Sequence, residues 1–114
     1  SVRTIIDMRD AMRAYGLTIL HCRPGEAYNI GGVTAIKVGD FLDQLIALSS
    51  VTIKTHCNPD LLRPADVTLQ IPCVDKFTEI TGWEPQYTFE ESTAHLLEYW
   101  RKKADEEVQR RSLV

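Results

Sequence analysis

The stretch VDKFTEITGWEPQYTFEE, residues 74–91, predicts one short helix, its end, and the start of a longer helix. Gly82 suits the end of the short helix, because a residue without Cβ can adopt the left-handed conformation that closes a helix. Pro85 prevents the helix from resuming. Thr88 and Glu91 form a T-x-x-E capping box, so we expect the last helix to begin there.

Two more helices are expected before this stretch. Asp7 can cap the first, because its carboxylate accepts from the free N–H groups of a first turn, and the turn signal at residues 23–25 should end that helix. The second should run from about Val38 to Ser49, and the short helix quoted above from Val74 to Thr81. Helical spacing predicts three buried apolar stripes. They consist of Met8, Ala11, Met12, Tyr15 and Ile19; of Val38, Phe41, Leu42, Leu45 and Leu48; and of Leu96, Leu97, Trp100 and Ala104.

Three short apolar runs, at residues 2–6, 27–30 and 51–55, predict strands. Residues 62–72 carry two prolines in an irregular pattern, which indicates an ordered loop. We therefore expect a mixed α/β (α+β) domain over residues 1–101, with a few short strands and three to four helices. Residues 102–114 should form a charged helical tail that frays.

The composition is that of an ordinary globular domain and excludes several classes of function. Of the 114 residues, 44% are hydrophobic and 25% charged. The net charge of −3 argues against a nucleic-acid binder, which needs a basic face. No apolar run is long enough to span a bilayer, so we expect a cytoplasmic protein without a membrane partner. Because the chain starts at Ser1 rather than Met, we expect an N-terminus made by cleavage or by design.

The cysteines and histidines predict neither a disulfide framework nor a metal site. The three cysteines are an odd number without a C-x-x-C pair, so reduced thiols are expected. The histidines show no metal-ligand spacing, and neither a Ser-His-Asp nor a Cys-His arrangement can be argued. These residues are Cys22, Cys57, Cys73, His21, His56 and His95.

Three segments, taken in order, resemble the C-terminal part of the extended short-chain dehydrogenase/reductases. They read VRTIIDMRD at residues 2–10, GEAYNIGG at 25–32 and LRPADV at 62–67, the last followed by DKF at 75–77 and TGWEP at 81–85. Within that family they are most similar to GDP-mannose 4,6-dehydratase and its relatives. The resemblance covers about residues 2–101 and implies that these segments surround the nucleotide diphosphate of a sugar substrate.

The resemblance implies three substrate-binding residues. Arg3 and Arg63 would approach the diphosphate, and a guanidinium suits this role because its fork of donors matches phosphate oxygens. Asp66 would accept hydrogen bonds from the ribose hydroxyls. The alternatives are a solvated Arg3 and a simple surface pair between Arg63 and Asp66.

The sequence does not contain the parts that the family uses for chemistry. The six glycines form neither G-x-x-G-x-x-G nor G-x-G-x-x-G, so the cofactor-binding Rossmann domain is expected to be absent. The family's catalytic Tyr-x-x-x-Lys occurs once, from Tyr99 to Lys103, after every other landmark, and we interpret it as accidental. We therefore expect no catalytic, cofactor-binding or metal-binding residue in this chain, whereas the parent enzyme would use NAD or NADP.

The first hypothesis is therefore the substrate-binding part of a nucleotide-sugar 4,6-dehydratase that is inactive alone. A 4-epimerase or 4-reductase parent stays open, and so does a non-enzymatic assembly domain derived from the family. The expected partners are a nucleotide-diphosphate sugar, the missing Rossmann domain, and further copies of the chain, because a domain cut from a larger one exposes apolar surface. Such a homo-oligomer could exchange the N-terminal segment or the last helix. The base, the sugar, and NAD versus NADP stay open.

Overall fold

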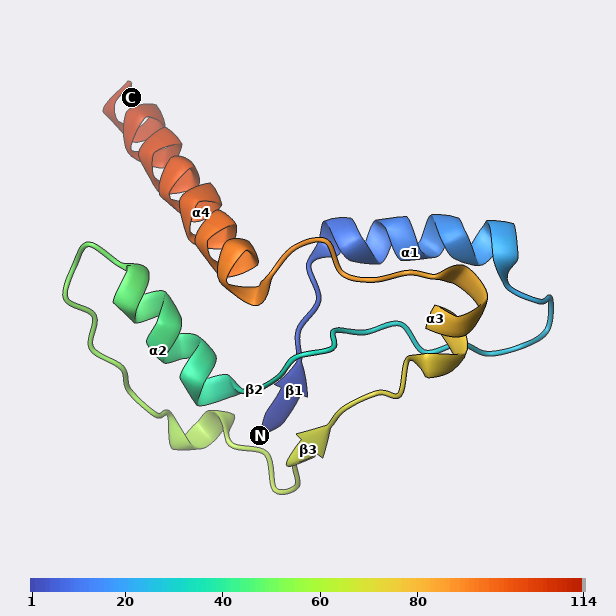
Figure 1. Cartoon of the computed structure of the whole chain (residues 1–114). Coiled ribbons are helices and arrows are strands. Elements are labelled where there is room, and N and C mark those ends of the chain that lie inside the picture. Colours follow the sequence, from blue (N-terminus) through green and yellow to red (C-terminus); the bar gives the residue numbers. More distant parts are fainter. Residues whose placement is uncertain (114) are drawn as a thin grey trace.

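The computed structural model describes residues 1–113 as a mixed α+β fold, as expected from the sequence (Figure 1). Four α-helices accompany a small sheet of three strands and one turn of 3₁₀ helix. In chain order the elements are β1 (Val2–Thr4), α1 (Met8–His21), β2 (Ala35–Lys37), α2 (Val38–Leu48), η1 (Pro59–Leu61), β3 (Leu69–Gln70), α3 (Asp75–Thr81) and α4 (Phe89–Ser112).

The sheet has the order β2-β1-β3, with β1 antiparallel to β2 and parallel to β3. The first predicted strand is confirmed but shorter, whereas the strands predicted at 27–30 and 51–55 are wrong. Tyr28 and Ile30 are apolar because they pack against the core, and their backbone has no strand partner. Residues 51–55 are exposed coil, and β3 lies instead inside the predicted loop 62–72.

The core lies where α1 meets α3 and the segment after it. Ala14, Phe77 and Trp83 are each at most 1% exposed, and the rings of Phe77 and Trp83 are 6.0 Å apart. Gly82 ends α3 with a φ of 68°, which confirms the left-handed cap expected from the sequence. This conformation turns the chain so that Trp83 covers the end of the helix.

Helix α1 buries Ala11 of the predicted stripe, but the rest of its buried face differs from the prediction. Asp7 caps the helix as expected, but Asp10, Ala11 and Ala14 are its buried residues. The predicted stripe is largely in solvent, because the indole of Trp83 lies close to α1 and donates from Nε1 to the carbonyl oxygen of Asp10. Small residues fit this close approach and large ones do not. The exposed members of the predicted stripe are Met8 (65%), Met12 (52%), Tyr15 (58%) and Ile19 (85%).

Helices α2 and α4 run side by side, and the upper half of α4 projects past the end of α2 (Figure 1). The rings of Phe41 and Phe89 are 5.5 Å apart at one end of the pair, and Arg101 Nη2 donates to the carbonyl oxygen of Leu48 at the other. The capping box of Thr88 and Glu91 is present, as predicted. The helix α4 continues to Ser112, and the fraying of its charged tail stays a prediction.

The chain is far less compact than its length would allow. Its radius of gyration is 18.2 Å, against about 13 Å for a compact domain of this length. Its accessible surface is 9064 Å², against about 6,300 Å² for a folded monomer of this mass. The predicted stripes of α2 and α4 contribute to the excess, because Val38, Leu42, Leu48, Leu96 and Trp100 are each more than 40% exposed.

Among residues 1–113, no helix is both long and apolar enough to cross a membrane.

Candidate functional site

Arg3 and Asp66, two of the three predicted site residues, lie together in the structure. Arg3 is on the central strand β1, and its Nη2 is 3.5 Å from Asp66 Oδ1. The pair is loose and partly solvated, since the two side chains are 26% and 54% exposed. The other terminal nitrogen of Arg3, Nη1, is buried and has no hydrogen-bond partner among residues 1–113. The guanidinium therefore keeps donors that residues 1–113 do not use, and the side chain that carries them lines a cleft.

Arg3 lines a cleft of about 670 Å³ that runs between β1, β3 and the segment 29–32. Besides Arg3, the cleft is lined by backbone and by small or uncharged side chains: Thr4, Ile6, Asn29, Ile30, Gly31, Gly32, Leu69, Gln70, Ile71 and Pro72. Arg3 is therefore the single charged side chain among the residues that line it.

The glycine pair is what brings the cleft wall close to β1. A Cβ on Gly32 would overlap the carbonyl oxygen of Ile5, and a Cβ on Gly31 would be 2.7 Å from Pro72 Cγ. Both glycines are buried. Asn29 holds the same segment from the other side, because its Nδ2 donates to the carbonyl oxygen of Cys73.

Arg63, the third predicted site residue, is exposed in the loop between η1 and β3 and is not among the residues that line the Arg3 cleft. Its side chain has no hydrogen bond or ion pair with residues 1–113. The surface pair between Arg63 and Asp66, the alternative from the sequence, is not found either, because Asp66 pairs with Arg3. Convergence of Arg3 and Arg63 on one diphosphate stays a prediction.

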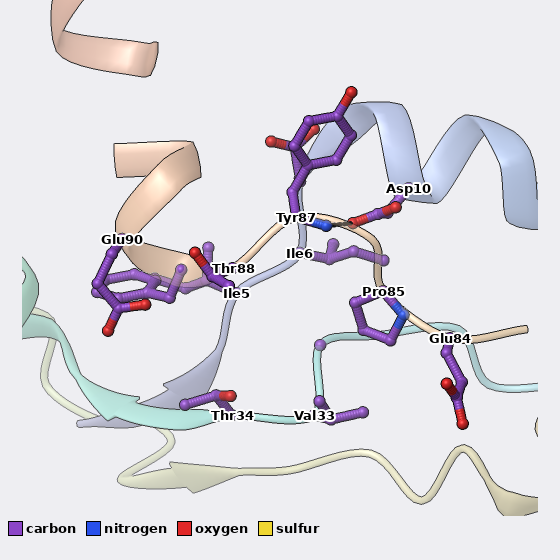
Figure 2. A pocket seen from close by; sticks show the side chains of 13 residues that line it. Ile5, Ile6, Asp10, Val33, Thr34, Glu84, Pro85, Tyr87, Thr88 and Glu90 are labelled. Atoms are coloured by element: carbon purple, nitrogen blue, oxygen red, sulfur yellow. Dashed lines mark hydrogen bonds between the residues drawn. The ribbon is translucent and has the colours of Figure 1, made fainter. Parts of the chain in front are cut away.

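A second cavity, of about 510 Å³, lies on the other side of Ile6 and Gly32 (Figure 2). Its lining includes four carboxylates, from Asp7, Asp10, Glu84 and Glu90, and no lysine or arginine. A negatively charged ligand is disfavoured there, because it would meet like charges. Of these two cavities, the Arg3 cleft is the one whose charge suits an anionic ligand. A third cavity, of about 600 Å³, is lined in part by Arg9, but that guanidinium is already paired with Asp7 at 2.8 Å.

Asp10 is the residue that the sequence reasoning missed in this second cavity. Its carboxylate is 1% exposed and accepts from the backbone N–H groups of Gln86 and Tyr87, as Figure 2 shows for Tyr87. Arg13 Nη2 is 3.5 Å from the same carboxylate and also donates to the carbonyl oxygen of Glu84. Asp10 thus positions residues 84–88. Sequence reasoning had no signal for this role, because the partners of Asp10 lie 76 and 77 residues further along the chain.

Asp7 joins the start of α1 to α4 through a second polar cluster. Its carboxylate accepts from the backbone N–H and side chain of Arg9 and from the hydroxyl of Ser92. The hydrogen bonds from Arg9 hold the pKa of Asp7 well below its usual range, against the opposing effect of burial. The Arg9 guanidinium also lies 3.6 Å from the ring centre of Tyr87 and 2.9 Å from His95 Nδ1.

These residues do not fit a dinucleotide cofactor. A pyrophosphate site needs a glycine-rich turn that opens a helix, whereas Gly31 and Gly32 are packed against Pro72 and Ile5 and lead into β2. Lys103 lies 5.7 Å from the ring centre of Tyr99 and ion-pairs with Glu106, so it is not aimed at the tyrosine hydroxyl. No step that uses a cofactor can be derived from this chain.

The comparisons with known proteins relate this chain to one part of a longer protein. No protein-family model matches the sequence. The chain is 24% identical over 105 residues to GDP-6-deoxy-D-mannose reductase of Pseudomonas aeruginosa, an extended short-chain dehydrogenase/reductase. The match covers 92% of this chain and 34% of the reductase, in its C-terminal part.

A solved structure, of RMD from the same organism complexed with NADPH, has the same fold in its C-terminal part. The TM-score is 0.80 at 22% identity, over 90% of this chain and 33% of that one. The chain thus spans about a third of the length of the proteins it matches. Both proteins are similar to this chain at the level expected from the sequence resemblance to extended short-chain dehydrogenase/reductases, and they do not support a particular likeness to GDP-mannose 4,6-dehydratase.

Proposed function

We propose that this chain is the substrate-binding part of an NAD(P)-dependent nucleotide-sugar enzyme and that Arg3 binds the diphosphate. The observation that carries the proposal is the partly buried Arg3, with one terminal nitrogen left without a partner, as the single charged side chain in its cleft. A diphosphate offers the acceptors that this nitrogen lacks, and charge-assisted hydrogen bonds of this kind are about twice as strong as neutral ones.

Among the parent reactions, the reductase alternative is favoured over the dehydratase. Support comes from the reductase of Pseudomonas aeruginosa, since the matching region extends over nearly all of this chain. A GDP-hexose is then the substrate class, and the hydride would come from a nicotinamide cofactor held by a domain outside this chain. The dehydratase and epimerase assignments remain predictions from the sequence resemblance.

Asp66 contributes ribose recognition in this proposal, and its loose pair with Arg3 does not prevent binding. Exposed ion pairs contribute about 0 to 1 kcal/mol, so a doubly charged diphosphate displaces the carboxylate readily. Asp66 is then free to accept from a ribose hydroxyl. Arg63, exposed in the same loop as Asp66, would add a second cation to the diphosphate.

The exposed surface supports a missing partner domain. The excess of about 2,700 Å² over a compact monomer is comparable to an obligate interface. We assign the face of α1 formed by Met8, Met12, Tyr15, Ile19 and Leu20 to the cofactor-binding domain, because these large apolar residues are each at least 52% exposed.

Calorimetry with GDP, UDP and inorganic diphosphate tests the assignment. We expect weak binding, which falls at least tenfold in Arg3→Ala and less in Arg63→Ala. Arg23→Ala removes an exposed arginine away from the cleft and should leave the affinity unchanged. Asp66→Asn should reduce the preference for GDP over its 2′,3′-dideoxy analogue. The proposal is contradicted if the unmodified chain, Arg3→Ala and Arg23→Ala bind GDP with the same affinity and heat of binding while their circular dichroism spectra are unchanged.

A further inference from the structure

The second half of α4 is a helical arm without support from the rest of the chain. Beyond Arg101, which reaches the end of α2, the hydrogen bonds and ion pairs of residues 102–113 all lie within α4. Figure 1 shows this arm projecting into solvent. A helix of about 12 residues is marginal in water without packing, so a surface that covers the arm would stabilise it.

The arm carries an exposed apolar stripe. Trp100, Ala104 and Val108 are spaced by four residues, so successive members are about 40° apart around the helix and lie on one side. Trp100 is 61% exposed and Val108 67% exposed. The small Ala104 lies between the two large residues, where it would allow a second helix to approach closely.

We propose that this arm pairs with the same arm of a second copy, antiparallel, about a twofold axis at Ala104. The axis places Trp100 of one copy at the level of Val108 of the other, so the two large side chains fill the space beside the alanines. The symmetry makes the contact self-complementary and closed. The inference does not rest on the proposed function, because it uses no residue of the Arg3 cleft.

The charges beside the stripe favour this antiparallel arrangement. With a rise of about 1.5 Å per residue, Lys103 of one copy lies within about 3 Å, along the axis, of Glu107 of the other, on the same side of the stripe. On the opposite side, Arg101 is placed in the same way beside Asp105 of the other copy. Each kind of pair occurs twice. The twofold axis also brings Lys103 of the two copies to within about 3 Å along the helix axis, but Lys103 lies about 100° and Glu107 about 60° from the line of contact, so Glu107 is the nearer neighbour.

Of the four charged residues, Lys103 and Asp105 are weakly engaged within the chain. The side chain of Asp105 has no hydrogen bond or ion pair with residues 1–113, and the pair between Lys103 and Glu106 is 3.7 Å long and exposed. Pairs of this kind within one helix contribute only a few tenths of a kcal/mol.

Glu107 pairs with Arg110 at 2.7 Å and with Arg111 at 3.2 Å, so its pair with a second copy would be shared with these contacts inside α4. Arg101 keeps its contact with the carbonyl oxygen of Leu48. The interface, about three helical turns long, is small, below about 1,200 Å², so we expect a weak dimer.

Charge reversal tests the pairing on the whole 114-residue chain. Sedimentation velocity over about 10 to 300 µM, a range suited to a weak dimer, should show dimers of the parent chain. Lys103→Glu and Glu107→Lys should each weaken dimerisation at least tenfold, because each variant places like charges beside each other. An equimolar mixture of the two variants should dimerise again, since both pairs then have opposite charges.

Two matched variants complete the test. Lys102→Glu makes the same change of charge away from the stripe and should leave dimerisation unchanged, whereas Trp100→Ala should weaken it at least tenfold. Circular dichroism checks that each variant keeps its helices. The proposal is overturned if the unmodified chain stays monomeric at the highest concentration. It is also overturned if Lys103→Glu and Lys102→Glu weaken dimerisation equally, or if the mixture of Lys103→Glu and Glu107→Lys does not dimerise.

Discussion

Two regions of the chain differ sharply in how they are held. Around α1, α3 and residues 82–88, a small apolar core is surrounded by buried polar contacts, most of them to Asp10. Among residues 50–71, in contrast, every residue is exposed to solvent over a large part of its surface. The first region is held by its own packing and hydrogen bonds, whereas the second makes few contacts that would fix its conformation.

This difference separates the residues that form the core from two of the residues predicted to bind the substrate. The exposed segment carries Arg63 and Asp66, two of the three residues predicted to bind the substrate, and the packed region carries none of them. Substrate-binding loops commonly belong to the less stable part of a fold. The segment is therefore expected to gain order from a ligand or from the missing domain, while the packed region supplies the fixed frame.

The largest expected effect is on the packed region, through Trp83→Ala. The indole is 1% exposed and fills the space between α1 and α3, so its loss should lower the free energy of unfolding by about 4 kcal/mol. Urea denaturation followed by circular dichroism measures this change. Trp100→Ala is the matched control, because Trp100 is 61% exposed and should change stability by less than about 1 kcal/mol. Similar losses for both tryptophans would refute the assigned core.

The second prediction concerns the glycine pair that joins the two regions. Gly32→Ala should lower the free energy of unfolding by about 3 kcal/mol, because its Cβ would overlap the backbone of Ile5. Gly16→Ala should instead stabilise α1 by about 0.5 to 1 kcal/mol, since no atom lies within 4 Å of its added methyl group. Thermal melts of both variants provide the measurement. The two substitutions must change the free energy of unfolding in opposite directions. If Gly32→Ala leaves it unchanged, the cleft wall is not closely packed.

The third prediction is the acid sensitivity of the Asp7 cluster. The folded state lowers the pKa of Asp7 below its ordinary 3.8, so its contribution is complete above about pH 5 and is lost as the pH falls toward the folded value. Asp7→Asn should cost about 1 to 2 kcal/mol at pH 7, because the amide oxygen can still cap the helix but the charge-assisted hydrogen bonds from Arg9 are lost. It should also reduce the pH dependence of stability between pH 5 and 2. An unchanged slope in Asp7→Asn would show that other carboxylates cause the acid sensitivity.

The smallest effect is expected in the exposed segment. Ile53→Ser should change the free energy of unfolding by less than about 0.5 kcal/mol, because Ile53 is 45% exposed and lies in coil. Limited proteolysis should cleave the chain first between residues 50 and 71. A loss above 1 kcal/mol would mean that this segment packs more closely in solution, and the contrast between the two regions would disappear.

The sequence predicts the ends of elements better than the faces that they bury. Asp7, Gly82 and the Thr88 capping box act locally, through backbone groups a few residues away, so their roles were predicted correctly. The buried face of α1 depends on Trp83, which is 73 residues from its acceptor Asp10, and no periodicity in α1 alone reports that contact. The stripes of α2 and α4 are apolar as predicted but are only partly covered in this chain.

For the candidate site, the sequence indicated which residues to consider, but it did not predict how they are arranged in space. The resemblance identified Arg3 and Asp66, which lie together, but the cleft that contains Arg3 depends on β3 and the glycine pair, both far along the chain. Sequence reasoning assigned 62–72 to a loop and so could not place a strand beside Arg3. The buried Arg3 Nη1 follows from packing alone and has no signature in the sequence.

The position of β1 has a consequence for how the chain folds. Arg3 is paired with Ile36 on one side and Gln70 on the other, so the central strand precedes both of its neighbours by dozens of residues. Closing such large loops costs entropy before any pairing can compensate for it, and sheets of this kind form slowly. The helices can form early from local contacts, while the sheet, and with it the cleft that contains Arg3, is expected to assemble last.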